Sequence, residues 1–476
     1  MELRSGRRLR SLPTPRPRRT RRPPVFPDGD GSDRFTALPD EMLLEILARL
    51  RCARAAADTS GLSRRWRGLW KHLLELSFRD MPADAAVAAL GQVAGQVAGQ
   101  ALSFLEVDIP YKHRVPEPAR VSALLHAAAR LAPADLFFRL YGDCKDGNFP
   151  FEIPCFERAT SVKLYIMGLY LIPPAGAVEF PLLEKLSVVC SRVDTAELVR
   201  RCPRLRVFEI QFYPSRDVAA NRIKVHSPTI EDLAVDVYRQ LDRLDIIAPV
   251  LKRFSLRVKI GKDSTVSFSA PMVENIWWYC SFQHNYVGFG EKWRLSSLKL
   301  VMEENVGVLH MWIYWKGYDV LPDRTFSQEI AQLLAFSVLE LELELDLQSK
   351  IHGIGALVSH LLGVCSSIRR LKVDKQYFGA TKCSPNCPCD QPQNWRNEII
   401  SLTALEEVEL IGLDGTENDV DLLKLLFRCA PLMKSMTVVL APDSSLPTDQ
   451  DCEEIYSMFE ENPHVKCSVD RSPCKG

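Results

Sequence analysis

The sequence predicts an α/β fold, in which a short all-helical segment is followed by a leucine-rich repeat solenoid with a parallel sheet on its concave face. Two patterns support this prediction. Apolar residues recur at helical spacing within residues 33–80, and a pattern of the form apolar-x-x-apolar-x-apolar recurs about every 22 residues further along. At 476 residues the chain is too long for one compact core, which suits a repeat architecture.

Residues 1–32 are predicted to be a disordered basic arm. Residues 1–27 contain nine arginines and one acid, Glu2, and have few apolar residues to bury. Because the whole chain has a formal net charge of zero, the remainder is mildly acidic, and we expect it to bind no nucleic acid. The basic run at residues 16–22 suits either a nuclear-import signal or a solvated tail. The sequence contains no apolar run long enough for a membrane span and no secretory pattern, so we expect the nucleus and/or the cytoplasm.

Residues 33–80 are predicted to form three short helices. The first begins at Leu38-Pro39-Asp40-Glu41, since proline and acidic residues are favoured in a first helical turn. Two apolar stripes follow at helical spacing: Leu43, Ile46, Leu47 and Leu50, then Leu62, Trp66, Leu69, Trp70 and Leu73. Periodicity alone allows either a structural cap on a larger domain or an interaction module.

Residues 81–380 are predicted to form the solenoid, and residues 381–476 to continue it. The regular copies of the pattern begin at Ala159, Leu183, Leu205, Ile230, Leu251, Val273 and Leu295, and less regular copies at Val338, Ile368, Leu405 and Met433. The last two apolar positions alternate along a strand and point inward, so each copy buries its face against its neighbours. Segments 194–202 and 421–429 are predicted to be helices on the convex side.

Two features of the repeats are candidates for binding. Glu340, Glu342, Glu344 and Asp346 alternate with leucines, which predicts one strand with an acidic outer face that could meet a basic partner. Aromatic residues are dense nearby, and they are either binding anchors on the concave sheet or large residues that fill the interior. These are Trp277, Trp278, Tyr279, Trp293, Trp312 and Trp315.

The sequence nominates no catalytic or metal site. Cys383, Cys387 and Cys389 have the spacing CxxxCxC with no fourth Cys or His nearby, whereas structural zinc needs four ligands. A surface loop with free thiols explains them better. No HExxH, P-loop or complete dinucleotide fingerprint is present, so we expect a chain without cofactor or catalysis.

The string Leu38-Pro39-Asp40-Glu41, continuing through Leu44, Leu47 and Leu50 to Leu62-Ser63-Arg64-Arg65-Trp66-Arg67-Gly68-Leu69-Trp70, resembles the F-box of plant F-box and leucine-rich repeat proteins. Residues 381–476, with Arg428-Cys429-Ala430-Pro431, are similar to the C-terminal FBD region of the same group. The resemblance therefore implies an F-box at 33–80 and an FBD-like region at 381–476.

The resemblance implies a substrate-recognition subunit of a Skp-cullin-F-box type E3 ubiquitin ligase. The F-box would bind a Skp-type adaptor, which links it to a cullin and a RING protein, and the repeats would hold a target protein. The residues expected to contact the adaptor are Leu38, Pro39, Leu44, Leu47, Leu50, Leu62, Trp66 and Trp70. The alternatives are an interaction scaffold without target turnover and, as in plant hormone receptors of this architecture, a small-molecule sensor.

Overall fold

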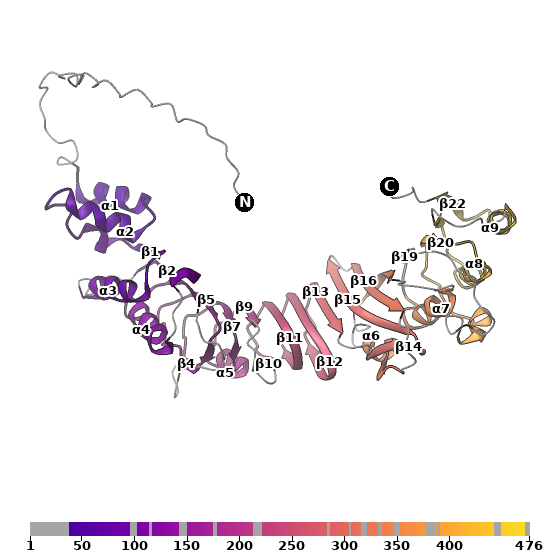
Figure 1. Ribbon diagram of the computed structural model, residues 1–476, viewed down its shortest axis with the longest axis horizontal. Helices are drawn as coiled ribbons and strands as arrows, with labels where there is room; N and C mark the ends of the chain where they lie inside the picture. Colours follow the sequence, from indigo (N-terminus) through magenta and orange to yellow (C-terminus); the bar gives the residue numbers. More distant parts are fainter. Residues whose placement is uncertain are drawn as a thin grey trace, which may run out of the picture.

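The computed structural model describes residues 38–95, 102–113, 117–141, 150–174, 179–212, 221–282, 286–303, 306–315, 321–331, 333, 336–346, 353–376, 387, 391–441 and 449–471. The described chain follows an arc, with a helical segment at its N-terminal end, a long sheet along the inner side and most helices along the outer side (Figure 1). Among these residues, no helix is both long and apolar enough to cross a membrane.

The helical segment contains α1 (Asp40–Arg49), α2 (Ala53–Asp58) and the 3-10 turns η1 (Thr59–Gly61) and η2 (Leu69–His72). Asp40 and Glu41 lie in the first turn of α1 and Arg49 in its last, where each charge complements the helix dipole. The third α-helix predicted from the second stripe is wrong. Residues 64–68 form turns and Gly68 has a φ of 88°, a conformation that favours glycine and ends helical geometry.

The inner sheet is mostly parallel, as the sequence predicts. Neighbouring strands pair in parallel in two runs, from β1 to β13 and from β16 to β22. The first run comprises β1 (Glu75–Arg79), β2 (Phe104–Asp108), β3 (Asp135–Tyr141), β5 (Ser161–Met167), β7 (Lys185–Cys190), β9 (Val207–Phe212), β11 (Asp232–Ile247), β12 (Arg253–Ser269) and β13 (Asn275–Phe282). The second comprises β16 (Val306–Trp315), β18 (Val338–Asp346), β19 (Arg370–Gln376), β20 (Glu407–Leu413), β21 (Ser435–Leu440) and β22 (Lys466–Arg471).

One strand departs from the predicted parallel order. The copy that begins at Leu295 corresponds to β15 (Trp293–Glu303), which pairs antiparallel with both β13 and β16. The sheet thus contains a reversed strand between its two parallel runs, and the interpretation of Leu295 as one more repeat is wrong. The other predicted copies each begin just before or at a parallel strand. In addition, β1 lies inside the range 33–80 that was predicted to be all helical.

The outer side is built from helices and short strands (Figure 1). The helices are α3 (Ala83–Ala94), α4 (Pro118–Ala129), α5 (Thr195–Arg200), α6 (Phe326–Ile330), α7 (Gly355–Val364), α8 (Glu417–Cys429) and α9 (Asp449–Glu461). Of these, α5 and α8 match the two helices that the sequence predicts. A second, three-stranded sheet joins β4 (Pro150–Glu152), β6 (Tyr170–Ile172) and β8 (Arg192–Val193). Beyond it, β10 (Asn221–His226) pairs with the second half of β11, which pairs with the second half of β12.

The core fills the space between the two sides. In β18, Leu341, Leu343 and Leu345 are buried, whereas the acids that alternate with them are half-buried on the opposite face. The prediction of a strand with an acidic outer face is therefore confirmed, and that face belongs to the concave side of the arc.

Candidate functional site

The structure separates the eight predicted adaptor-contact residues by burial. Three lie in the core, namely Leu47, Trp66 and Trp70, with 1%, 8% and 6% of their surface exposed. Leu38 and Leu44 are half-buried, and Pro39, Leu50 and Leu62 are exposed, Leu62 to 70%. The two tryptophans therefore hold the helical segment together, and the exposed residues form its outer surface.

A guanidinium group fixes the shape of this surface. Arg65 donates a hydrogen bond of 2.8 Å to the Asp40 carboxylate and another to the carbonyl oxygen of Leu38. These bonds hold the turn that follows Leu62 against the first turn of α1. Met42 lies in that turn of α1 and is 44% exposed, an apolar surface residue that the helical stripe did not single out. The sequence offered only its position three residues after Pro39, and its exposure is known from the structure alone.

The aromatic residues of β13, β15 and β16 divide between the two faces of the sheet. Trp278 and Trp293 are buried in the interior, where Trp315 packs edge-on against Trp293. On the concave face, Trp277 stacks with Tyr279 at 6.2 Å between ring centroids, and Trp312 stacks with His310 at 6.1 Å. The interpretation as interior residues is thus confirmed for Trp278 and Trp293, whereas Trp277, Tyr279 and Trp312 lie on the face where binding anchors are expected.

Two arginines on the concave face, Arg257 and Arg139, each contact both a carboxylate and an aromatic ring. The Arg257 guanidinium is 5.1 Å from the centre of the Trp277 ring and 3.8 Å from the Asp236 carboxylate. Burial raises the pKa of Asp236, and Arg257 opposes that rise. Arg139 repeats the arrangement, since it donates a 2.8 Å hydrogen bond to Asp108 and lies 5.9 Å from the Phe137 ring. This face therefore uses cation–π contacts with a carboxylate partner.

The acidic strand β18 is only partly neutralised by its neighbours. Glu342 lies 2.7 Å from Nδ1 of His310, and Glu344 accepts a 2.6 Å hydrogen bond from the side-chain amide of Gln376. Among the described residues, the cation seen near Glu340 is Arg370, at 3.9 Å. No ion pair or hydrogen bond is seen for the Asp346 carboxylate among the described residues.

A cavity of about 510 Å³ opens on this part of the concave face. We call it the aromatic–acidic cavity; its lining residues are Tyr279, Ser296, Ser297, Trp312, Ile313, Tyr314, Glu344, Asp346 and Gln376. Ser296 is an extra residue in β15, because the pairing with β16 shifts between Leu295 and Ser297. Such bulges bend a strand and are frequent next to binding sites. Burial raises the pKa of Tyr314, which therefore keeps its hydroxyl proton at neutral pH.

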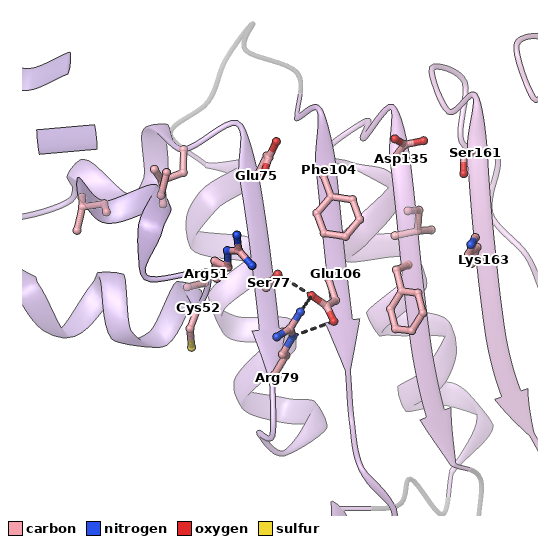
Figure 2. A pocket seen from close by; sticks show the side chains of 16 residues that line it. Arg51, Cys52, Glu75, Ser77, Arg79, Phe104, Glu106, Asp135, Ser161 and Lys163 are labelled. Carbon is pink, nitrogen blue, oxygen red and sulfur yellow. Dashed lines mark hydrogen bonds and ion pairs between the residues drawn. The ribbon is translucent and has the colours of Figure 1, made fainter. Parts of the chain in front are cut away.

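A second cavity, of about 570 Å³, lies where the helical segment meets the first strands. Figure 2 shows Arg79 reaching across from β1 to the Glu106 carboxylate on β2, with hydrogen bonds of 2.8 and 2.7 Å. We call this cavity the junction groove. The charges of its lining residues cancel, since it has three cationic residues, Arg51, Arg79 and Lys163, and three acidic ones, Glu75, Glu106 and Asp135. The groove therefore favours neither a cationic nor an anionic ligand.

The cysteines give no sign of metal binding or catalysis where the structure describes them. Cys383 and Cys389 lie outside the described residues, and Cys387 is buried, so the prediction of a surface position is wrong for Cys387. Within those residues, no group of three or more Cys, His, Asp and Glu side chains has the arrangement of a metal site. Burial raises the pKa of Cys190, Cys280 and Cys365, so these thiols stay protonated and are poor nucleophiles.

Comparison with known proteins finds relatives in Arabidopsis thaliana, whereas no known family profile matches the chain. Two FBD-associated F-box proteins are 25% and 22% identical to it over 249 and 244 residues, which cover 50% and 49% of this chain. An F-box protein is 45% identical over 56 residues, 14% of its own length. The chain spans about half the length of the first two relatives, 52% and 53%. The relatives confirm the resemblance that the sequence motifs indicate, which is to plant F-box proteins with an FBD region.

Proposed function

We propose that this chain is the substrate-recognition subunit of a Skp-cullin-F-box type E3 ubiquitin ligase. The observation that carries the proposal is the helical segment at the end of the arc, which combines the LPDE and SRRWRGLW motifs with an exposed apolar surface. Its relatives are named as F-box proteins. The concave sheet offers a long second surface for a target protein.

In this proposal the chain performs no bond chemistry. The adaptor, a cullin and a RING protein supply the charged conjugating enzyme, and the chain raises the effective concentration of the target's lysines near it. This role requires only two separate binding surfaces on one rigid body. We propose the nucleus and/or the cytoplasm as its location, since the basic run at residues 16–22 suits import.

The adaptor contact is assigned to the exposed part of the helical segment. Pro39, Leu50 and Leu62 provide the outermost apolar groups, and Leu38 and Leu44 contribute their exposed edges. Leu47, Trp66 and Trp70 support this surface from the core. We add Met42, because its exposed side chain lies one turn from Pro39.

The test is a pull-down of the full-length chain with a plant Skp-type adaptor. A variant that lacks residues 33–73 removes the helical segment and spares β1. Leu62→Asp is the sharper variant, because Leu62 is exposed and its replacement leaves no cavity. We expect the intact chain to bind and both variants to lose binding. Failure of the intact, folded chain to bind would reduce the helical segment to a structural cap.

A further inference from the structure

The aromatic–acidic cavity repeats a local arrangement of the concave face without its cation. At two other places on this face a carboxylate and an aromatic ring hold an arginine between them, with Arg257 beside Trp277 and Arg139 beside Phe137. The cavity offers the same two components, the rings of Tyr279, Trp312 and Tyr314 and the carboxylates of Glu344 and Asp346. Among the described residues, no lysine or arginine lines the cavity.

We propose that the aromatic–acidic cavity binds an arginine side chain carried by a partner protein. This rests on the proposed function, because the partner is then the target held on the concave face. The charge favours a cation, since two carboxylates two residues apart on the same face of β18 line a space that has no basic residue in its described lining. The size suits a side chain, since a cavity of about 510 Å³ lies within the usual range for ligand sites of roughly 300–1,000 Å³.

Arginine fits better than lysine for geometric reasons. The planar guanidinium stacks on aromatic rings and presents a fork of donors to a carboxylate, whereas the lysine ammonium is a more strongly hydrated point charge. Glu344 is already oriented by its hydrogen bond from Gln376, so one oxygen remains to accept from the ligand. Trp312 is held in place by its stack on His310, which keeps the aromatic wall in position before the ligand arrives.

The competing candidates for the cavity are lysines and arginines of the chain itself. Lys299 lies on the same face, where it pairs with Tyr279 and His310, but it does not line the cavity. Lys316 and Lys350 follow β16 and β18 in the sequence, and the arginines of residues 1–27 precede the helical segment; all lie outside the described residues. An experiment must therefore separate a partner's arginine from these.

The probe is Nα-acetyl-L-arginine amide, titrated into the full-length chain labelled with 5-fluorotryptophan. Fluorine NMR follows the Trp312 resonance, which is assigned with Trp312→Phe. We expect a saturable shift of this resonance. The double variant E344Q/D346N should weaken binding at least about tenfold, as expected for the loss of hydrogen bonds to a charged group. Nα-acetyl-L-lysine amide should bind several-fold more weakly.

The matched control is Glu75→Gln with Asp135→Asn, which removes the same two charges from the junction groove on the same sheet. It should leave the titration unchanged. A shift that does not saturate, or that survives in E344Q/D346N, would overturn the proposal. Binding seen only after removal of residues 1–32, or only in Lys316→Ala with Lys350→Ala, would make one of the chain's own cations the occupant and would equally overturn it.

The adaptor pull-down distinguishes this proposal from the proposed function. E344Q/D346N should bind the adaptor as the unmodified chain does, because neither residue lies in the helical segment. A chain that binds the arginine probe but not the adaptor would retain the cavity assignment and lose the ligase role. A chain that binds the adaptor but not the probe would retain the ligase role and lose the cavity assignment.

Discussion

Leu62 and Trp66 lie four residues apart in one motif, yet the structure gives them opposite environments. Trp66 is 8% exposed and Leu62 is 70% exposed. The family resemblance implies that both contact the adaptor, and helical spacing predicts that residues four apart lie on the same face. That argument fails here because the segment is not an α-helix. Turns at residues 64–68 direct Trp66 inward and leave Leu62 outside.

This difference predicts different outcomes for two substitutions. Trp66→Ala removes a buried ring and should destabilise the helical segment by about 3–5 kcal/mol, so any loss of adaptor binding accompanies unfolding. Leu62→Asp should abolish adaptor binding with a change in unfolding free energy within about 0.5 kcal/mol, as is usual at the surface. Circular dichroism during chemical denaturation, run beside the pull-down, separates the two. A folded Leu62→Asp protein with normal adaptor affinity would remove Leu62 from the contact surface.

A second prediction at this scale concerns His360 in α7. Its ring stacks on Phe289 at 4.2 Å, and burial lowers its pKa below the ordinary value of 6.5, while Glu398 opposes the shift. The unfolded chain therefore takes up the proton first as the pH falls. The stability present above pH 6.5 should be lost progressively below it, down to the folded-state pKa.

Denaturation measured from pH 7.5 to pH 5 checks this prediction. We expect His360→Gln to show a smaller loss of unfolding free energy over this range than the unmodified chain. The range lies above the titration of most carboxylates, so their contribution is small. Equal pH dependence in the two proteins would show that His360 has the same pKa in the folded and unfolded chains, contrary to the shift that its burial causes.

At the scale of elements, the sequence patterns identified strands better than strand directions. The alternation of apolar residues reads the same from either end, so the copy at Leu295 matched the repeat although β15 runs antiparallel. A signal for the reversal was present. Leu309, Met311 and Ile313 alternate soon after β15, which places two strands within one repeat length. A hairpin fits that spacing, whereas a parallel crossover needs a dozen or more residues.

The strands β1, β2 and β3 escaped prediction for a different reason. They begin at residues 75, 104 and 135, intervals of 29 and 31 residues, whereas the seven regular copies from Ala159 to Leu295 are spaced about 22 residues apart. The longer intervals accommodate α3 and α4, each 12 residues long, on the outer side. A search tuned to the 22-residue period therefore missed these first strands, and it found the later copies with full-helix crossovers, such as Ile368 and Met433, only as less regular ones. Their apolar alternation, such as Leu136 and Phe138, is otherwise regular.

Two glycines of α7 give a matched prediction at the element scale. A Cβ added at Gly355 would lie 2.2 Å from the indole ring of Trp395, which is fully buried and cannot move aside. Gly355→Ala should therefore destabilise the chain by about 1–3 kcal/mol. A Cβ at Gly363 meets no atom within 4 Å, so Gly363→Ala should stabilise the same helix by about 0.5–1 kcal/mol. Thermal denaturation that shifts both variants in the same direction would contradict this account of α7.

At the scale of the whole molecule, the two proposed sites occupy separate parts of one arc. The helical segment lies at the N-terminal end, and β16 and β18, which line the aromatic–acidic cavity, lie beyond the middle (Figure 1). Between them runs a sheet whose strands contact mainly their neighbours, as in other repeat architectures. The sequence predicted this separation, since the motifs of 33–80 and the acidic strand are far apart in a chain whose repeats stack in order. It could not predict the cavity, which depends on the reversed strand β15 and its bulge at Ser296.

A receptor of the proposed form should bind its two partners independently. Coupling between sites requires an element with two arrangements that both ligands bias, and stacked strands with a continuous buried core provide rigid support instead. We therefore expect Leu62→Asp to abolish adaptor binding and leave the affinity for the arginine probe unchanged. We expect E344Q/D346N to weaken binding of the probe and leave adaptor binding unchanged. The adaptor affinity measured with and without saturating probe should agree within about twofold, a coupling below the roughly 1–3 kcal/mol typical of allosteric proteins. A larger difference would mean that the arc changes shape when its concave face is occupied, and that target binding regulates assembly of the ligase as well as supplying its substrate.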